Sequence, residues 1–114
     1  MTSTIRHWRQ AGTGRTSLSL VTAPKPIPYA GEVLVRVTAA SLNYRDKLVL
    51  EGSVGLTPRE PIIPATDFAG VVEDVGDGVG NFRRGDRVVS TIAPEWFDGT
   101  VPTPDLPLAP SFRS

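Results

Sequence analysis

The sequence predicts a small, mainly β domain with one short helix, folded as a barrel or a sandwich. Eleven Gly and eleven Pro interrupt the 114 residues often and leave little room for long helices. Between these breaks, short segments alternate apolar and polar residues as half-buried strands do. Several short strands separated by turn signals fit a barrel or a sandwich better than a doubly wound α/β sheet.

The first predicted strand covers residues 16–21, in which Leu18 and Leu20 share one face. Prolines follow between residues 24 and 28 and predict an extended loop, because proline cannot donate to a strand ladder. The clearest strand signal comes next, in residues 31–40, where β-branched residues repeat at every second position. The shared face of this strand carries Val33, Val35 and Val37.

Two further strands are predicted, at residues 68–75 and 87–92. The link between them begins with the glycines of residues 76–80 and ends with the turn residues 83–86. We therefore expect the two strands to be neighbours in a hairpin-like arrangement.

One short helix is predicted over residues 43–50. Asn43 is a good N-cap residue, and Asp46 three positions later can supply the second half of a capping box. Gly52 is placed to end the helix, since glycine readily takes the left-handed conformation.

Charge and cysteine content exclude several classes of function. Twelve Lys and Arg balance twelve Asp and Glu, which argues against nucleic acid and anionic membranes as partners. Without cysteine there is no disulfide, thiolate nucleophile or cysteine-ligated zinc, and the single histidine, His7, cannot form a histidine metal cluster. No apolar stretch approaches the ~18 residues of a membrane helix, and no secretory signal is found. We expect a single cytoplasmic domain.

The glycine-rich segments and their acidic residues are interpreted as turns. Residues 12–16 lack the Gly-Lys-Ser/Thr end of a phosphate-binding loop, and residues 76–80 lack the spacing of a dinucleotide fingerprint. Asp77 and Asp86 stand beside glycines, where aspartate stabilises turns. His7 is interpreted as a strand-surface residue, because no G-x-S-x-G nucleophile motif accompanies it.

The densest polar cluster lies in residues 41–46, where the best strand meets the helix. Such a junction offers free backbone N–H groups and fixed side chains, which favours a functional site. A purely structural interpretation is also open, with Asn43 as the cap, Asp46 as its first-turn carboxylate and Tyr44 as core filler.

One pattern is matched, in order and spacing, by three separated blocks at residues 35–46, 61–72 and 75–88. They read VRVTAASLNYRD, PIIPATDFAGVV and VGDGVGNFRRGDRV. The pattern resembles the N-terminal, GroES-like domain of medium-chain dehydrogenases/reductases. The resemblance implies a GroES-like, partly open β-barrel with one short helix over residues 1–105, followed by a disordered tail over residues 106–114.

Zinc-containing members of that family carry a Cys after the first long strand and a later Gly-His-Glu. Here the matching positions are Asn43 and Ala65-Thr66-Asp67, and the four-Cys zinc lobe is missing. Asn and Thr are not a competent pair of zinc ligands. The resemblance therefore implies the zinc-independent branch, which includes quinone oxidoreductases, with NAD(P)H as the cofactor and no zinc.

The resemblance also implies roles for four residues. Asn43 would lie beside the nicotinamide and its ribose, and Tyr44 would line the substrate pocket and donate a hydrogen bond to the developing oxyanion. Asp46 would hold the junction, and Asp67 would lie in the same cleft. The substrate would be a quinone, an enone or another carbonyl or alcohol compound.

Nothing before residue 114 resembles the Rossmann domain that completes the family's site. We therefore expect a truncated fragment of the full enzyme, inactive alone, which exposes an apolar docking surface and forms a homodimer through it. The alternative is a non-enzymatic GroES-like interaction module or an inactive relic.

Overall fold

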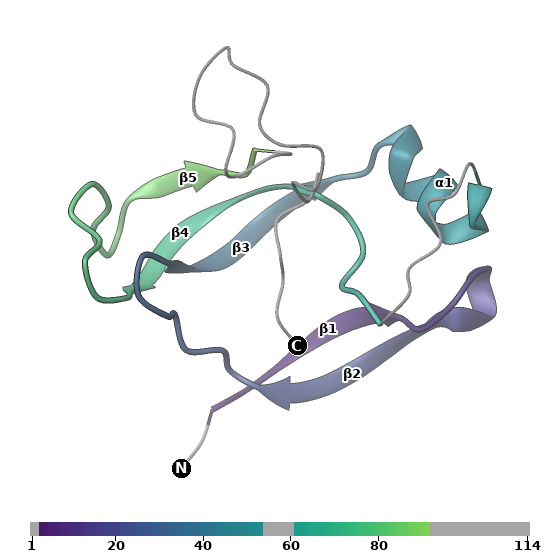
Figure 1. The fold of residues 1–114 in the computed structure, drawn as a ribbon, viewed down its shortest axis with the longest axis horizontal. Helices are drawn as coiled ribbons and strands as arrows, with labels where there is room; N and C mark the ends of the chain where they lie inside the picture. The colour runs from purple at the N-terminus through teal and green to yellow at the C-terminus, as the bar shows by residue number, and fades with distance from the viewer. Residues whose placement is uncertain (1–2, 54–60, 92–114) are drawn as a thin grey trace. The chain divides into compact units, whose positions relative to one another are not determined.

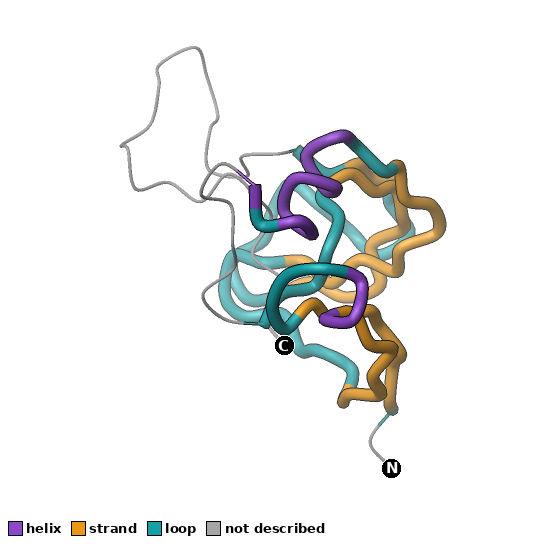
Figure 2. Tube along the Cα trace, turned by 90° about the vertical axis from the view of Figure 1, so that its right-hand side faces the viewer, coloured by secondary structure: helices purple, strands orange, loops and turns teal. Residues whose placement is uncertain are grey.

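The computed structural model describes residues 3–53 and 61–91, which divide between two compact units. Of the described residues, the first unit holds 3–26, 42–53 and 61–65, and the second holds 27–41 and 66–91. The elements, shown in Figure 1, are β1 (Thr4–Gln10), η1 (Arg15–Ser17), β2 (Leu18–Pro24), β3 (Val33–Ser41), α1 (Tyr44–Glu51), β4 (Asp67–Val75) and β5 (Arg87–Val89). Strands dominate over the short helical segments, as Figure 2 shows, which confirms the mainly β fold class.

The strands form two open sheets. In the first unit β1 pairs antiparallel with β2, and in the second β4 lies between β3 and β5, antiparallel to both. Neither sheet closes on itself within the described residues. This is the arrangement of a partial GroES-like barrel, and it confirms that the strands at 68–75 and 87–92 are neighbours.

The sequence predicted no bounds and no partner for strand β1, although His7 was expected on the surface of a strand. Polar side chains fill five of its seven positions, so it lacks the apolar alternation that marks β3. In the structure Trp8 lies directly opposite Leu20 on an exposed face of the ribbon, with 55% and 50% of their surfaces exposed. His7 lies on this strand, half-buried, and its Nδ1 is 3.0 Å from the Trp8 carbonyl oxygen.

Strand β2 begins at Leu18, two residues after the predicted start, because residues 15–17 form η1. It also runs on to Pro24, which pairs with Thr4 at the end of the ladder, where a missing N–H is tolerated.

Gln10 is the buried centre of the first unit, with 1% of its surface exposed. Its backbone exchanges two hydrogen bonds with Ile62, at 2.8 and 3.0 Å. Its side-chain Nε2 donates to the carbonyl oxygens of Gly12 at 2.8 Å and Val49 at 3.0 Å. One residue thus joins the end of β1, the segment around Ile62 and the last turn of α1.

Helix α1 begins and ends close to the predicted positions. Asn43 is its N-cap, and Gly52 ends it in the left-handed conformation, with φ 72°. The backbone N–H of Gly14 donates to the Leu50 carbonyl oxygen at 2.6 Å, so a second segment of the unit satisfies the C-terminal turn. No residue of α1 is fully buried, and these hydrogen bonds help to hold the helix in place beside the half-buried Leu48, Val49 and Leu50.

The three-stranded sheet buries its centre at Gly70 and Val72 of β4. Irregularities in the β3–β4 register lie between Leu34 and Val35 and between Val37 and Ala39. Strand β5 stops at Val89, three residues before the predicted end.

The link from β4 to β5 forms turns, as predicted. A Cβ on Gly76 would lie 1.9 Å from the Tyr29 carbonyl oxygen, so only glycine fits there. The Asp86 carboxylate accepts the Arg83 N–H at 2.9 Å, which is the turn role expected for this aspartate. Arg84 donates to Asp74 at 2.7 Å and ties the link to β4.

Two sequence expectations extend beyond the described residues. These are the single domain over residues 1–105 and the disordered tail over 106–114, and both stay predictions. Within residues 3–53 and 61–91, no helix is long and apolar enough to span a membrane.

We expect Gln10→Met to lower the free energy of unfolding by about 2 kcal/mol, because it removes two hydrogen bonds from a buried site without a large change in volume. Urea denaturation followed by circular dichroism measures the change. Arg9→Met, on the exposed neighbour, is the control and should shift stability by less than about 0.5 kcal/mol. Equal effects of the two variants would contradict the central role of Gln10.

Candidate functional site

The β3–α1 junction positions Asn43 and Asp46 by a reciprocal pair of hydrogen bonds. Asn43 is extended, with φ −115° and ψ 161°, and its N–H donates to Asp46 Oδ2 at 2.7 Å. The Asp46 N–H donates back to the Asn43 carbonyl oxygen at 3.0 Å. The structural interpretation of these two residues is therefore confirmed: they cap the helix and fix the backbone on which Tyr44 is carried.

Tyr44 is exposed, and its interpretation as core filler is wrong. It exposes 71% of its surface, and Leu42 on the other side of the cap exposes 80%. The Lys47 ammonium lies 5.7 Å from the centre of the Tyr44 ring and 3.7 Å from the Glu51 carboxylate. An exposed aromatic ring beside a fixed cap is a surface that can contact a ligand. Lys47 is a neighbour that sequence reasoning missed, although its i+3 spacing from Tyr44 on a helix is the signal that could have found it.

The fourth predicted site residue, Asp67, belongs to the second unit, where it is the first residue of β4. The structure thus brings Asn43, Tyr44 and Asp46 together in the first unit and places Asp67 in the second. Asp67 is half-buried and pairs with Ser41 in the β3–β4 ladder.

The chain on either side of Asp67 is held by Ser90. The Ser90 hydroxyl donates to the Thr66 carbonyl oxygen at 2.8 Å and accepts the Phe68 N–H at 3.0 Å. The Ser90 N–H donates to the Phe68 carbonyl oxygen at 3.0 Å. Ser90 was not predicted, because it comes from a distant segment and belongs to no motif.

Two energetically costly features precede Asp67. Ala65 has φ 74°, in the left-handed region that residues with a Cβ rarely adopt. Thr66 is 4% exposed, and its hydroxyl oxygen has no hydrogen-bond partner in the part of the chain that the structure describes. Strain and unmade hydrogen bonds of this kind are concentrated at functional sites in many proteins.

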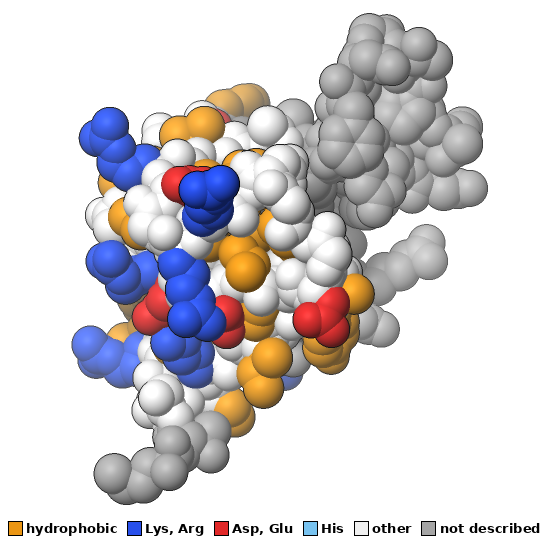
Figure 3. All heavy atoms as spheres, turned by 90° about the vertical axis from the view of Figure 1, so that its left-hand side faces the viewer, with side chains coloured by type: hydrophobic (Ala, Val, Ile, Leu, Met, Phe, Trp, Pro, Cys, Tyr) orange, Lys and Arg blue, Asp and Glu red, His pale blue; other side chains and the backbone are white. Residues whose placement is uncertain are grey.

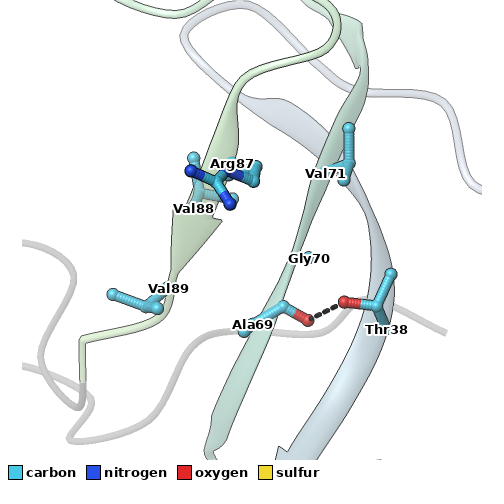
Figure 4. Close-up of a pocket in the computed structure, with 7 residues that line it drawn as sticks. All are labelled: Thr38, Ala69, Gly70, Val71, Arg87, Val88 and Val89. Atoms are coloured by element: carbon cyan, nitrogen blue, oxygen red, sulfur yellow. Dashed lines mark hydrogen bonds between the residues drawn. The ribbon is translucent and has the colours of Figure 1, made fainter.

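The second unit also has a shallow hollow of about 350 Å³ over the three-stranded sheet, shown in Figure 4. It is lined by Thr38, Ala69, Gly70, Val71, Arg87, Val88 and Val89. None of the four predicted site residues lines it. Its only hydrogen bond in Figure 4 runs from the Thr38 hydroxyl to the Ala69 carbonyl oxygen, at 3.3 Å.

The described part of the first unit is cationic. It contains six basic residues, Arg6, Arg9, Arg15, Lys25, Arg45 and Lys47, against two acidic residues, Asp46 and Glu51. The basic side chains of the chain are prominent on the face shown in Figure 3, with carboxylates among them. The excess of basic over acidic residues in the first unit attracts anionic groups such as phosphates.

No group of three or more His, Cys, Asp or Glu that could hold a metal ion occurs among residues 3–53 and 61–91.

The open sheets and the capped strand-to-helix junction define the class as a GroES-like β-domain. The family described as the alcohol dehydrogenase GroES-like domain matches residues 29–102. This chain belongs to that family.

Curated relatives include oxidoreductases of two kinds. A zinc-type alcohol dehydrogenase-like protein of Schizosaccharomyces pombe is 46% identical over 70 residues, which cover 61% of this chain and 20% of the relative. The chloroplast envelope quinone oxidoreductase homolog of Arabidopsis thaliana is 43% identical over 84 residues, which cover 72% and 26%. The chain thus matches only about a quarter or less of the length of these two relatives.

Solved structures show the same fold. A mycobacterial protein in complex with NADPH has a TM-score of 0.65 and 34% identity, covering 75% of this chain and 27% of its own. A cobalt- and zinc-bound thermostable alcohol dehydrogenase from Pyrobaculum aerophilum has a TM-score of 0.68 and 42% identity, covering 76% and 26%.

We expect Ala65→Gly to raise the free energy of unfolding by about 1 kcal/mol, because glycine adopts the left-handed conformation without the Cβ clash and this outweighs its greater freedom in the unfolded chain. Thermal and urea denaturation measure the change. Ala40→Gly, on the exposed half of β3, is the matched control and should lower stability by roughly 0.5–1 kcal/mol. A loss of stability in both variants would show that the strain at Ala65 is not relieved.

Proposed function

We propose that this domain contributes to a zinc-independent, cytoplasmic oxidoreductase that transfers hydride between NAD(P)H and a quinone, an enone or another carbonyl compound. The observation that carries the proposal is the β3–α1 junction, where a rigid cap presents the exposed Tyr44 ring within a cationic unit. The family match and the quinone oxidoreductase relatives support the reaction class. NADPH is supported by the mycobacterial structure of the same fold.

The chemistry of this chain's residues fits such a cofactor. Basic side chains outnumber acidic ones in the first unit, so the electrostatic field there suits phosphate groups. NADPH, when bound, supplies the hydride, and the reduced substrate oxygen takes up one proton. We assign Asn43 to the nicotinamide and its ribose, and Tyr44 to the substrate oxygen, on which its hydroxyl stabilises the developing negative charge.

Asp46 and Asp67 have supporting roles in this proposal. Asp46 holds the Asn43 backbone through the 2.7 Å hydrogen bond and so keeps the junction fixed. Asp67 contributes a carboxylate from the start of β4. Zinc takes no part, because the positions that match zinc ligands in the family are Asn43 and Thr66.

The first test is a titration of the 114-residue chain with NADPH, followed by NMR of the backbone amides. We expect saturable shifts of the amide signals of residues 43–47. The affinity for NADPH should be lower than that of a full-length relative, because the chain covers only a small share of the relatives' length. No saturation at millimolar NADPH would favour the alternative, a GroES-like module that binds a protein partner.

The second test measures activity in a chimera, in which this chain replaces the matching segment of the mycobacterial NADPH-binding protein. We expect Tyr44→Phe to lower kcat for menadione reduction about 100-fold, since it removes one hydrogen bond to the developing oxyanion. Tyr29→Phe alters the other exposed tyrosine and should leave kcat unchanged. Asn43→Ser keeps an N-cap residue and should raise the KM for NADPH more than it lowers kcat. Equal kcat values for Tyr44→Phe and the parent chimera would remove Tyr44 from the mechanism.

A further inference from the structure

Acidic and basic residues are distributed unevenly along this chain. The first 31 residues contain no Asp or Glu, but they contain four basic residues, Arg6, Arg9, Arg15 and Lys25. The described part of the first unit has six basic and two acidic residues, and that of the second unit has four basic and six acidic. The zero net charge of the chain is therefore a sum over regions of opposite sign.

Strands β1 and β2 form a two-stranded ribbon within the stretch that has no acidic residue (Figure 1). Side chains alternate between the two faces of such a ribbon. One face carries Ile5 and Val21, which are half-buried, and the other carries Arg6, Trp8 and Leu20, which are exposed. Trp8 and Leu20 are direct partners in the ladder, so they form one apolar surface on the strand that also carries Arg6.

The arginines near this surface are available to anionic groups. Arg6, Arg9 and Arg15 are exposed, and none of them forms an ion pair within the residues that the structure describes. A guanidinium group binds phosphate well, because its planar N–H donors match the geometry of the phosphate oxygens. The first unit thus combines an exposed tryptophan and leucine with arginines that no described carboxylate neutralises.

We propose that the ribbon face formed by Arg6, Trp8 and Leu20 binds the surface of an anionic lipid bilayer. Tryptophan is favoured at the level of the lipid headgroups, because its ring is apolar and its N–H is polar. Leucine adds apolar area, and anionic phospholipids attract the arginines. This inference goes beyond the proposed hydride transfer, since it gives the domain a peripheral attachment to a membrane.

Charge and side-chain chemistry favour a lipid surface over two other occupants of this face. A second copy of the chain would bring two cationic surfaces together, and like charges repel. Single-stranded nucleic acid stacks its bases on successive aromatic side chains, whereas the residue opposite Trp8 is the aliphatic Leu20. An anionic bilayer supplies negative charge and, beneath it, an apolar layer that can receive both side chains.

The test uses the 114-residue chain carrying Trp96→Phe, which leaves Trp8 as its single tryptophan. The probes are vesicles of phosphatidylcholine alone and vesicles in which about one third of the lipid is phosphatidylserine. Co-sedimentation measures the affinity, and the fluorescence of Trp8 reports its environment. We expect binding at least about tenfold tighter to the phosphatidylserine vesicles, weakened by added salt, with a blue shift of the Trp8 emission.

The contribution of charge is measured with two pairs of substitutions. Arg6→Gln combined with Arg9→Gln should weaken binding about 25-fold, since each basic residue near an anionic surface contributes about fivefold. Arg36→Gln combined with Arg87→Gln removes the same charge from exposed arginines of the second unit and is the matched control. The control pair should weaken binding less than about threefold, because screening limits the attraction of distant charges.

The contribution of the aromatic ring is measured by co-sedimentation in the chain that keeps Trp96. Trp8→Ser should weaken binding about tenfold or more, because it removes apolar area from the bilayer contact. Trp8→Tyr keeps an amphipathic ring and should bind within about threefold of the wild type. Ile27→Ser, at an exposed apolar residue of the second unit, is the control and should leave binding unchanged.

Four results would overturn the proposal. The first is equal binding to the two kinds of vesicle, and the second is binding that Trp8→Ser leaves unchanged. The third is a concentration-dependent dimer in sedimentation velocity that Trp8→Ser abolishes, since the ribbon would then join two copies of the chain. The fourth is binding of single-stranded DNA that depends on Trp8 and is tighter than vesicle binding. The vesicle test contains no NADPH, so its failure would leave the proposed function standing.

Discussion

The side-chain amide of Gln10 is the interaction on which the first unit depends. It donates to two backbone carbonyl oxygens, of Gly12 and Val49, while its own backbone pairs with Ile62. Gly12 is two residues away along the chain, but Val49 and Ile62 are distant in sequence, and the residue that joins them is almost completely buried. A buried amide that satisfies buried carbonyl groups fixes one arrangement, because any other leaves polar groups unpaired.

Helix α1 shows why this matters for the site. It has eight residues and none is fully buried, although Leu48, Val49 and Leu50 are half-buried, so its length and apolar packing alone would hold it weakly. Its C-terminal turn is satisfied by Gln10 and Gly14, and its N-terminal turn by the hydrogen bonds between Asn43 and Asp46. The helix is thus fixed at both ends by hydrogen bonds. The Tyr44 side chain is exposed and does not contribute to the packing that holds the helix.

In the second unit, a polar side chain again satisfies partly buried backbone groups, but a neighbouring one is left without a partner within the described residues. Ser90 satisfies the backbone around Asp67, yet the Thr66 hydroxyl has no partner among the described residues. Ala65, which ends the first unit just before this segment, keeps a left-handed backbone. A core selected for stability alone would place valine at one position and glycine at the other. Gln10 differs, because its side-chain amide donates to two carbonyl oxygens.

The sequence by itself determined the strands β3 and β4, the ends of α1 and the turns of the β4–β5 link. These depend on local chemistry: β-branched alternation, an Asn cap, and glycines such as Gly76 where no Cβ fits. The three blocks at residues 35–46, 61–72 and 75–88 also indicated the family without the structure, because each block is a short run of consecutive residues. Only the tertiary structure decided the bounds and the partner of β1, the exposure of Tyr44, and the hydrogen bonds by which Ser90 holds the chain around Asp67. Each of these depends on partners distant in sequence, and no local pattern reports where such partners will lie.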